Sequence, residues 1–130
     1  MAKSCSSENY LKSILILLKR KGKVRSVDVA KELGVSKPSV CVAMKKLRQE
    51  NMIYFSEEGH ILFTEFGKAV AEKIYNKHLL LSKMFQSIGV SENTADNDAC
   101  LLEHSISDET YECLSRFYRN TLAPTMENAG

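Results

Sequence analysis

Three residues in the last third of the chain have the types and spacing of a metal site. Cys100, Glu103 and His104 stand at positions i, i+3 and i+4, so in a helix their side chains leave the same face. A thiolate, a carboxylate and an imidazole that converge on one point are ligands for a divalent metal ion. The spacing therefore predicts a metal-binding helix, which we expect from about residue 92 to residue 104.

Charged residues are divided unevenly along the chain, although the net charge is only +2. Residues 19–48 contain ten basic side chains: Lys19, Arg20, Lys21, Lys23, Arg25, Lys31, Lys37, Lys45, Lys46 and Arg48. Residues 92–112 contain seven acidic side chains and no Lys or Arg: Glu92, Asp96, Asp98, Glu103, Asp108, Glu109 and Glu112. The asymmetry favours a polyanion-binding region followed by a cation-binding region; uneven solvated faces are the alternative.

The composition limits the class of protein. A chain of 130 residues with 44% hydrophobic and 26% charged residues has the size and balance of one globular domain or two small lobes. Its apolar runs are too short to span a bilayer, and its first residues lack the apolar stretch of a secretory signal. We therefore expect a cytoplasmic protein without a membrane partner. Its cysteines show no C-x-x-C spacing, so Cys5, Cys41 and Cys113 are expected to be ordinary small residues.

The first half of the chain has a helix-turn-helix pattern. Apolar periodicity predicts helices over about residues 8–21, 27–33 and 37–50, with Gly22 and Gly34 ending the first two. Ser26 and Ser36 are the expected caps of the second and third helices, and Pro38 lies in the first turn of the third. The third helix, which should bury Val40, Met44 and Leu47, is the expected DNA-recognition helix.

A β-hairpin and three further helices are expected after the recognition helix. Strands over residues 52–55 and 60–63 flank a polar turn and would form the wing of a winged helix. Thr64 should cap a long helix over residues 65–88, whose buried side is expected to include Phe66, Val70, Ile74, Leu81 and Phe85. A sixth helix should begin after Ser107. The predicted fold is mainly α with a small hairpin: a winged helix-turn-helix domain (1–64) and a helical metal-binding and dimerisation domain (65–130).

The whole pattern resembles the diphtheria toxin repressor family of iron- and manganese-dependent regulators. The similarity covers about residues 8–118. The segments that carry it are Glu8-Asn9-Tyr10-Leu11, Val35-Ser36-Lys37-Pro38-Ser39-Val40, Leu62-Phe63-Thr64-Glu65-Phe66-Gly67, Lys77-His78 and Ala99-Cys100-Leu101-Leu102-Glu103-His104-Ser105-Ile106-Ser107-Asp108.

The resemblance implies a transcriptional repressor rather than an enzyme. It implies a homodimer that binds operator DNA when loaded with Fe(II) or Mn(II) and controls metal-homeostasis genes. Co(II), Ni(II) or Zn(II) could replace these ions in vitro. Longer family members carry an additional C-terminal SH3-like barrel, and this chain is expected to be the short form without it.

The resemblance also implies site residues. The metal ligands carried over are His78, Cys100, Glu103 and His104, with Asn9 from the first helix and Asp96 where iron-type members have a second histidine. The thiolate of Cys100 favours Fe(II) over Mn(II). The chain departs from the family at Lys12, where manganese-type members have an acid, and at Ser82, where iron-type members have a glutamate.

DNA contacts are expected along the third helix. Ser36, Lys37, Pro38 and Ser39 stand at its N-terminus, where N–H groups and hydroxyls meet phosphates and base edges. Val42 holds a position where iron-type relatives carry a polar base reader, and Lys45 and Lys46 are expected to neutralise phosphates. Arg25, Ser26 and His60 are weaker candidates.

Some alternatives stay open at this stage. Ile88, Leu101, Leu114 and Phe117 could form the dimer interface or the core of one chain. A winged-helix regulator with lost or retuned metal sensing, responding to redox through Cys100 or binding DNA constitutively, fits the same sequence. A metalloenzyme with Glu103 as general base fits poorly, because the helix lacks the histidine pair that usually flanks such an acid. A metal-storage module would not need the basic helix-turn-helix.

Overall fold

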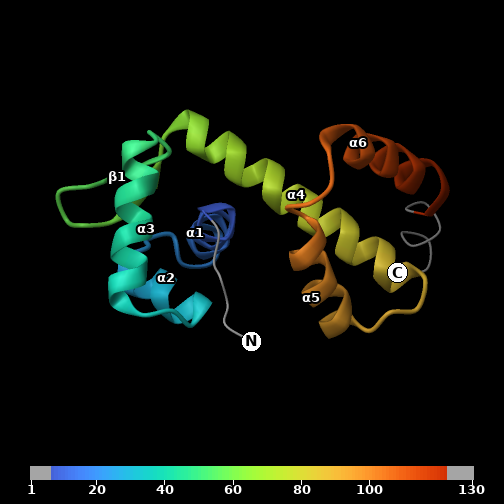
Figure 1. The fold of residues 1–130 in the computed structure, drawn as a ribbon, viewed down its shortest axis with the longest axis horizontal. Helices are drawn as coiled ribbons and strands as arrows, with labels where there is room; N and C mark the ends of the chain where they lie inside the picture. Colours follow the sequence, from blue (N-terminus) through green and yellow to red (C-terminus); the bar gives the residue numbers. More distant parts are fainter. Residues whose placement is uncertain (1–6, 123–130) are drawn as a thin grey trace. The chain divides into compact units, whose positions relative to one another are not determined.

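The computed structural model describes residues 7–122 of the chain, so the expectation for Cys5 falls outside the described residues. Six α-helices and one hairpin follow one another: α1 (Ser7–Lys21), α2 (Ser26–Leu33), α3 (Lys37–Gln49), β1 (Ile53–Phe55), β2 (Ile61–Phe63), α4 (Glu65–Ser87), α5 (Glu92–Leu102) and α6 (Asp108–Phe117) (Figure 1). A short π-helical segment, η1 (Tyr118–Leu122), continues α6. The predicted fold class is confirmed.

The chain divides into two compact units, residues 1–73 and 74–130, and passes from one to the other within α4. The predicted domain boundary at residue 64 remains a prediction. The hairpin ends at Phe63 and α4 begins at Glu65, whereas the compact units meet between residues 73 and 74.

The N-terminal unit is a three-helix core built on buried aliphatic side chains. In α3, Val40, Met44 and Leu47 are at most 2% exposed, as the periodicity predicted. Gly34 ends α2 with φ of +66°, a left-handed conformation that favours glycine. The tight turn after it lets α3 begin three residues later and pack against α2.

The cap of α2 differs from the predicted one. Arg25, and not Ser26, is the residue before the first helical turn. Its backbone N–H donates to the Asp28 carboxylate at 2.9 Å, and Lys21 Nζ donates to the other carboxylate oxygen at 2.8 Å. The hydrogen bond from Lys21 lowers the pKa of Asp28 below its ordinary value. The carboxylate at the third helical position therefore secures the start of α2.

The wing is an antiparallel hairpin in which Ile53 pairs with Phe63 and Phe55 pairs with Ile61. Ile53 and Ile61 are at most 1% exposed. The Ile61 N–H donates to the Val24 carbonyl at 2.7 Å, which ties the hairpin to the segment between α1 and α2.

Helix α4 begins with a close approach to the backbone just before the wing. Thr64 caps it by accepting from the Gly67 N–H at 2.9 Å, as predicted. A Cβ atom on Gly67 would lie 1.9 Å from the Met52 carbonyl oxygen. Because Gly67 and Ala71 face inward, Phe66 points outward and is 55% exposed, so its predicted burial was wrong.

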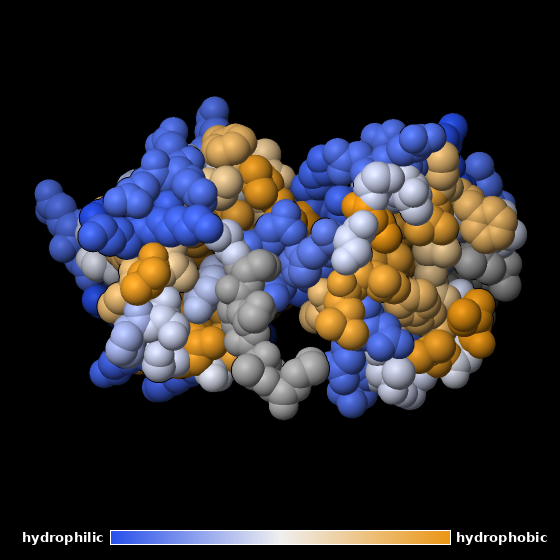
Figure 2. Space-filling view, viewed as in Figure 1, coloured by the Kyte–Doolittle hydropathy of each residue, from blue (hydrophilic) through white to orange (hydrophobic). Residues whose placement is uncertain are grey.

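The C-terminal unit has a small core lined by α4 and α5. Leu80, Leu81, Ala95 and Ala99 are at most 8% exposed. Ile88, Leu101 and Phe117 are 74%, 66% and 53% exposed, so they do not form the core of the single chain, and Leu114 is half-buried. Figure 2 shows apolar side chains gathered on the face of this unit. Among the described helices, none combines the length and apolarity needed to cross a bilayer.

Candidate metal centre and nucleic-acid interface

Three of the predicted metal ligands come together from α4 and the end of α5. His78 lies in α4 and Cys100 in the last turns of α5, while Glu103 is the residue that ends α5 and keeps helical backbone angles. His104 lies in the turn that follows, so the prediction that the helix includes it was wrong. The hydrogen bond from the Glu103 N–H to the Ala99 carbonyl is at the end of α5, and Ser107 caps the next helix, α6.

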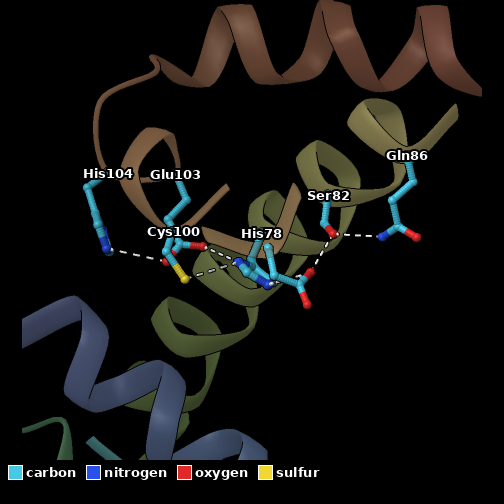
Figure 3. A network of polar contacts seen from close by, with 7 residues as sticks. His78, Ser82, Gln86, Cys100, Glu103 and His104 are labelled. Atoms are coloured by element: carbon cyan, nitrogen blue, oxygen red, sulfur yellow. Dashed lines mark hydrogen bonds and ion pairs between the residues drawn. The ribbon is translucent and has the colours of Figure 1, made fainter. Parts of the chain in front are cut away.

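The three side chains surround one point (Figure 3). One ligand atom each from His78, Cys100 and Glu103 lies within 4.8 Å of the others. Nδ1 of His78 is 3.1 Å from Oε2 of Glu103 and 3.8 Å from Sγ of Cys100. Two ligands of one tetrahedral zinc ion lie about 3.3 to 3.8 Å apart, given bonds of about 2.0 to 2.3 Å. The arrangement is close to the spacing that a small transition-metal ion requires.

Glu103 is the most buried member of this group. Its side chain has no exposed surface, whereas the side chains of His78 and His104 keep 14% and 23%. A buried carboxylate is costly unless positive charge or hydrogen bonds compensate it. Here Oε2 faces His78 and Oε1 lies 3.4 Å from Nε2 of His104. His104 therefore contacts the opposite oxygen of Glu103 and is not one of the three clustered ligands.

Two further predicted ligands, Asp96 and Asn9, belong to different units of the chain. Asp96, in α5, places Oδ1 at 3.8 Å from Nε2 of His78, on the nitrogen that faces away from Cys100 and Glu103. Asn9 lies half-buried in α1 of the N-terminal unit. Lys12, one turn after Asn9, is only 8% exposed. The structure thus brings together a nitrogen, sulfur and oxygen donor from the C-terminal unit.

Two side chains that support the site, Ser82 and Lys77, were not predicted to do so from the sequence. Ser82, 4% exposed, donates from Oγ to Oδ1 of Asp96 at 2.5 Å. Lys77 lies 3.3 Å from the Asp108 carboxylate and 3.5 Å from the Ile106 carbonyl, which fixes the turn after His104. The acidic residues in the first turn of α6 could have suggested a basic partner for that turn. That this partner is Lys77, which contacts Asp108, is evident only from the structure.

The start of α3 presents polar groups suited to DNA phosphates and base edges. Ser36 caps the helix by accepting from the Ser39 N–H at 3.2 Å, and its hydroxyl also bonds to the Ser39 hydroxyl. Pro38 occupies the first turn, where its missing N–H leaves no intrahelical bond unmade. Every predicted DNA contact in α3 is exposed, and Val42 is 70% exposed.

The weaker wing candidates have structural partners. Arg25 precedes α2, and its guanidinium lies where a Cβ on Gly59 would come within 3.1 Å. His60 is mostly buried, with Nδ1 3.5 Å from the Glu58 carboxylate. Arg25 and His60 therefore lie beside the turn of the wing.

Comparison with known proteins gives matches over nearly the whole chain. Residues 4–61 match the N-terminal DNA-binding domain of the iron-dependent repressors, and residues 64–122 match their metal-binding and dimerisation domain. Among solved structures, the manganese regulator SloR is 29% identical, with a TM-score of 0.79 over 90% of this chain and 55% of its own.

Two further structures are similar. IdeR of T. acidophilum is 27% identical, with a TM-score of 0.76 over 89% of this chain and 55% of its own. ScaR with bound Zn2+ is 28% identical, with a TM-score of 0.73 over 88% and 54%. The chain thus spans about half the length of these relatives.

Proposed function

Since the chain belongs to the iron-dependent repressor family, we propose that it is a transcriptional repressor whose affinity for operator DNA depends on a bound divalent metal ion. The observation that carries this proposal is the cluster of His78, Cys100 and Glu103 within 4.8 Å, in a chain that also presents an exposed, capped α3. The matched domains bind DNA and metal, which supports a regulatory and not a catalytic role.

The metal would be held by the imidazole of His78, the thiolate of Cys100 and the carboxylate of Glu103. His104 and Asn9 remain predicted additional ligands. When bound, the ion would supply positive charge that stabilises the buried Glu103 carboxylate and the thiolate.

A nitrogen, sulfur and oxygen donor set discriminates among metals. Thiolate ligands favour Fe(II), Co(II), Ni(II) and Zn(II) over the harder Mn(II). Relatives of known structure include a manganese regulator and a protein with bound Zn2+, so the family accommodates several ions. For this chain we propose Fe(II) as the regulatory metal.

The DNA partner would be a palindromic duplex bound by a homodimer. Helix α3 would enter the major groove, with Ser36, Lys37, Pro38 and Ser39 at its leading end and Val42 facing the bases. Lys45 and Lys46 would neutralise phosphates. The exposed Ile88, Leu101 and Phe117 supply apolar surface for the dimer contact, and such a regulator would act in the cytoplasm on metal-homeostasis genes.

The test is anaerobic fluorescence-anisotropy binding of the protein to DNA from upstream of its own coding sequence. Fe(II), Mn(II), Zn(II) and a chelator are compared at one salt concentration. We expect tight binding with Fe(II) and loss of at least tenfold in affinity with chelator. Cys100→Ser should lose the metal response, whereas Cys113→Ser, an exposed cysteine outside the cluster, should keep it.

Equal binding with metal and with chelator would contradict metal control. It would favour the alternative that the chain is a winged-helix regulator with lost or retuned sensing. Binding that changes only with oxidant, and that Cys100→Ser abolishes, would identify a redox response. Absence of binding to this and to related palindromic sequences would count against a regulator of this kind.

A further inference from the structure

The imidazole of His78 presents its two nitrogens to two different sets of neighbours (Figure 3). Nδ1 faces Oε2 of Glu103 at 3.1 Å and Sγ of Cys100 at 3.8 Å. Nε2 faces Oδ1 of Asp96 at 3.8 Å. Because the lone-pair directions of the two ring nitrogens diverge, one ion bound at Nδ1 between Cys100 and Glu103 would lie on the far side of the ring from Asp96. An ion held between Cys100 and Glu103 would therefore bind Nδ1, and the ring proton would then be on Nε2.

The Asp96 carboxylate is held in place by a directed chain of hydrogen bonds. The Gln86 amide can only donate through Nε2, and it donates to Oγ of Ser82 at 3.0 Å. The single hydroxyl proton of Ser82 is thereby directed to Oδ1 of Asp96, at 2.5 Å. Ser82 stands one helical turn after His78 and is 4% exposed, so its position is fixed by packing. In this series of hydrogen bonds Asp96 only accepts, and its carboxylate faces the ring of His78.

We propose that Asp96 and Ser82 are positioning residues for the metal site and that Asp96 is not itself a ligand. This inference rests on the proposed metal-dependent function. At 3.8 Å the contact between Asp96 and Nε2 is electrostatic and too long for a hydrogen bond. An ion on Nδ1 would withdraw electron density from the ring and make Nε2–H more positive, so the nearby carboxylate would stabilise the loaded state more than the empty one. Carboxylates that orient a ligating histidine in this way typically contribute about 10- to 100-fold in metal affinity.

Asp96 and Ser82 both stand where iron-type members of the family have other residues. Asp96 and Ser82 replace a histidine and a glutamate of iron-type members, and here they bond to each other. The Ser82 hydroxyl occupies Oδ1 of Asp96, which is the oxygen nearest His78. The two residues thus act on the cluster through His78.

The experiment measures Zn(II) affinity of the full chain by competition with a chelating dye, under reducing conditions, for wild type and four variants. Asp96→Ala should weaken Zn(II) binding about 10- to 100-fold. Asp96→Asn keeps an oxygen acceptor, so its Zn(II) affinity should lie between that of Asp96→Ala and that of wild type. Ser82→Ala should also weaken binding, because Asp96 loses its donor. The matched control is Asp98→Asn, an exposed acid on the same helix, which should change affinity by less than about twofold.

A second readout separates orientation from ligation. Nitrogen-15 NMR of the Zn(II)-loaded protein should show a metal-bound Nδ1 and a protonated Nε2 on His78. A metal-bound Nε2 would place the ion on the side of Asp96 and would overturn the proposal. Ser82→Ala binding Zn(II) as tightly as wild type would also overturn it, because the bond to Asp96 would then have no effect on the site.

The outcomes for the proposed function are distinct. If wild type binds Zn(II) and Asp96→Ala binds it equally well, the positioning role is wrong while metal-dependent regulation stands. If wild type binds no Zn(II), both the metal-dependent function and the positioning role are wrong. Far-UV circular dichroism of each variant confirms folding, and Asp96→Asn is the variant least able to disturb it.

Discussion

Replacing Gly67 with alanine should destabilise the protein although alanine is the better helix former. Gly67 lies in the first turn of α4, and its added Cβ would meet the Met52 carbonyl oxygen at 1.9 Å. Real contacts of this kind are not shorter than 3.0 Å, so helix and carbonyl must separate by about 1.1 Å. The atom in the way is backbone, which cannot rotate aside as a side chain does.

The cost follows from the hydrogen bonds at that joint. The Thr64 N–H donates to the Met52 carbonyl at 3.1 Å, and its single hydroxyl proton is shared between the Asn51 carbonyl at 2.8 Å and the Met52 carbonyl at 3.2 Å. A separation of about 1.1 Å takes these bonds out of range. Two donors at a net 0.5 to 1.5 kcal/mol each amount to about 1 to 3 kcal/mol, and alanine returns about 1 kcal/mol of helix propensity. We expect a net loss of about 1 kcal/mol, and at most about 2 kcal/mol, in the free energy of unfolding.

The assay is urea unfolding followed by far-UV circular dichroism, with Ala69→Gly as the control. Ala69 is exposed in the same helix, so its replacement should cost only the propensity difference of about 1 kcal/mol. Together the two variants test whether a methyl group stabilises α4 at position 69 and destabilises it at position 67. A Gly67→Ala protein as stable as wild type, or more stable, would refute the close approach of α4 to Met52.

Three further changes test other parts of the molecule. Cys100→Asp should shift metal preference toward Mn(II) relative to Zn(II), because a carboxylate is a harder ligand than a thiolate; competition titrations measure the ratio, and an unchanged ratio would exclude Cys100 as a ligand. Lys37→Ala should weaken operator binding and reduce the slope of log affinity against log salt by about 1; an unchanged slope would remove Lys37 from the phosphate contacts. The lowered pKa of Asp28, caused first by the hydrogen bond from Lys21, means that its ionised form stabilises the fold above its ordinary value of 3.8 and that this contribution disappears as the pH falls through the lowered pKa. Asp28→Asn should therefore be less stable than wild type near neutral pH and approach it in acid, as measured by urea midpoints at about pH 7 and about pH 3; a difference that stays constant with pH would contradict the assignment.

Features set by local physics could be read from the sequence. The caps by Ser36, Thr64 and Ser107 are bonds between residues three apart, so they depend only on neighbours along the chain. Apolar periodicity likewise identified the buried face of α3. Spacing within one segment placed Cys100 and Glu103 on the same side of α5 and its end.

Features that depend on how helices meet required the tertiary structure. The spacing at the end of α5 also suggested His104, but the turn toward α6 places it against the other oxygen of Glu103. The inward face of α4 is set by Gly67 on Met52, which left Phe66 exposed despite its apolar side chain. Which nitrogen of His78 faces the cluster, and that Ser82 bonds to Asp96, are consequences of packing α4 against α5. A sequence specifies such contacts only through the whole fold, because their partners lie 14 to 25 residues apart along the chain.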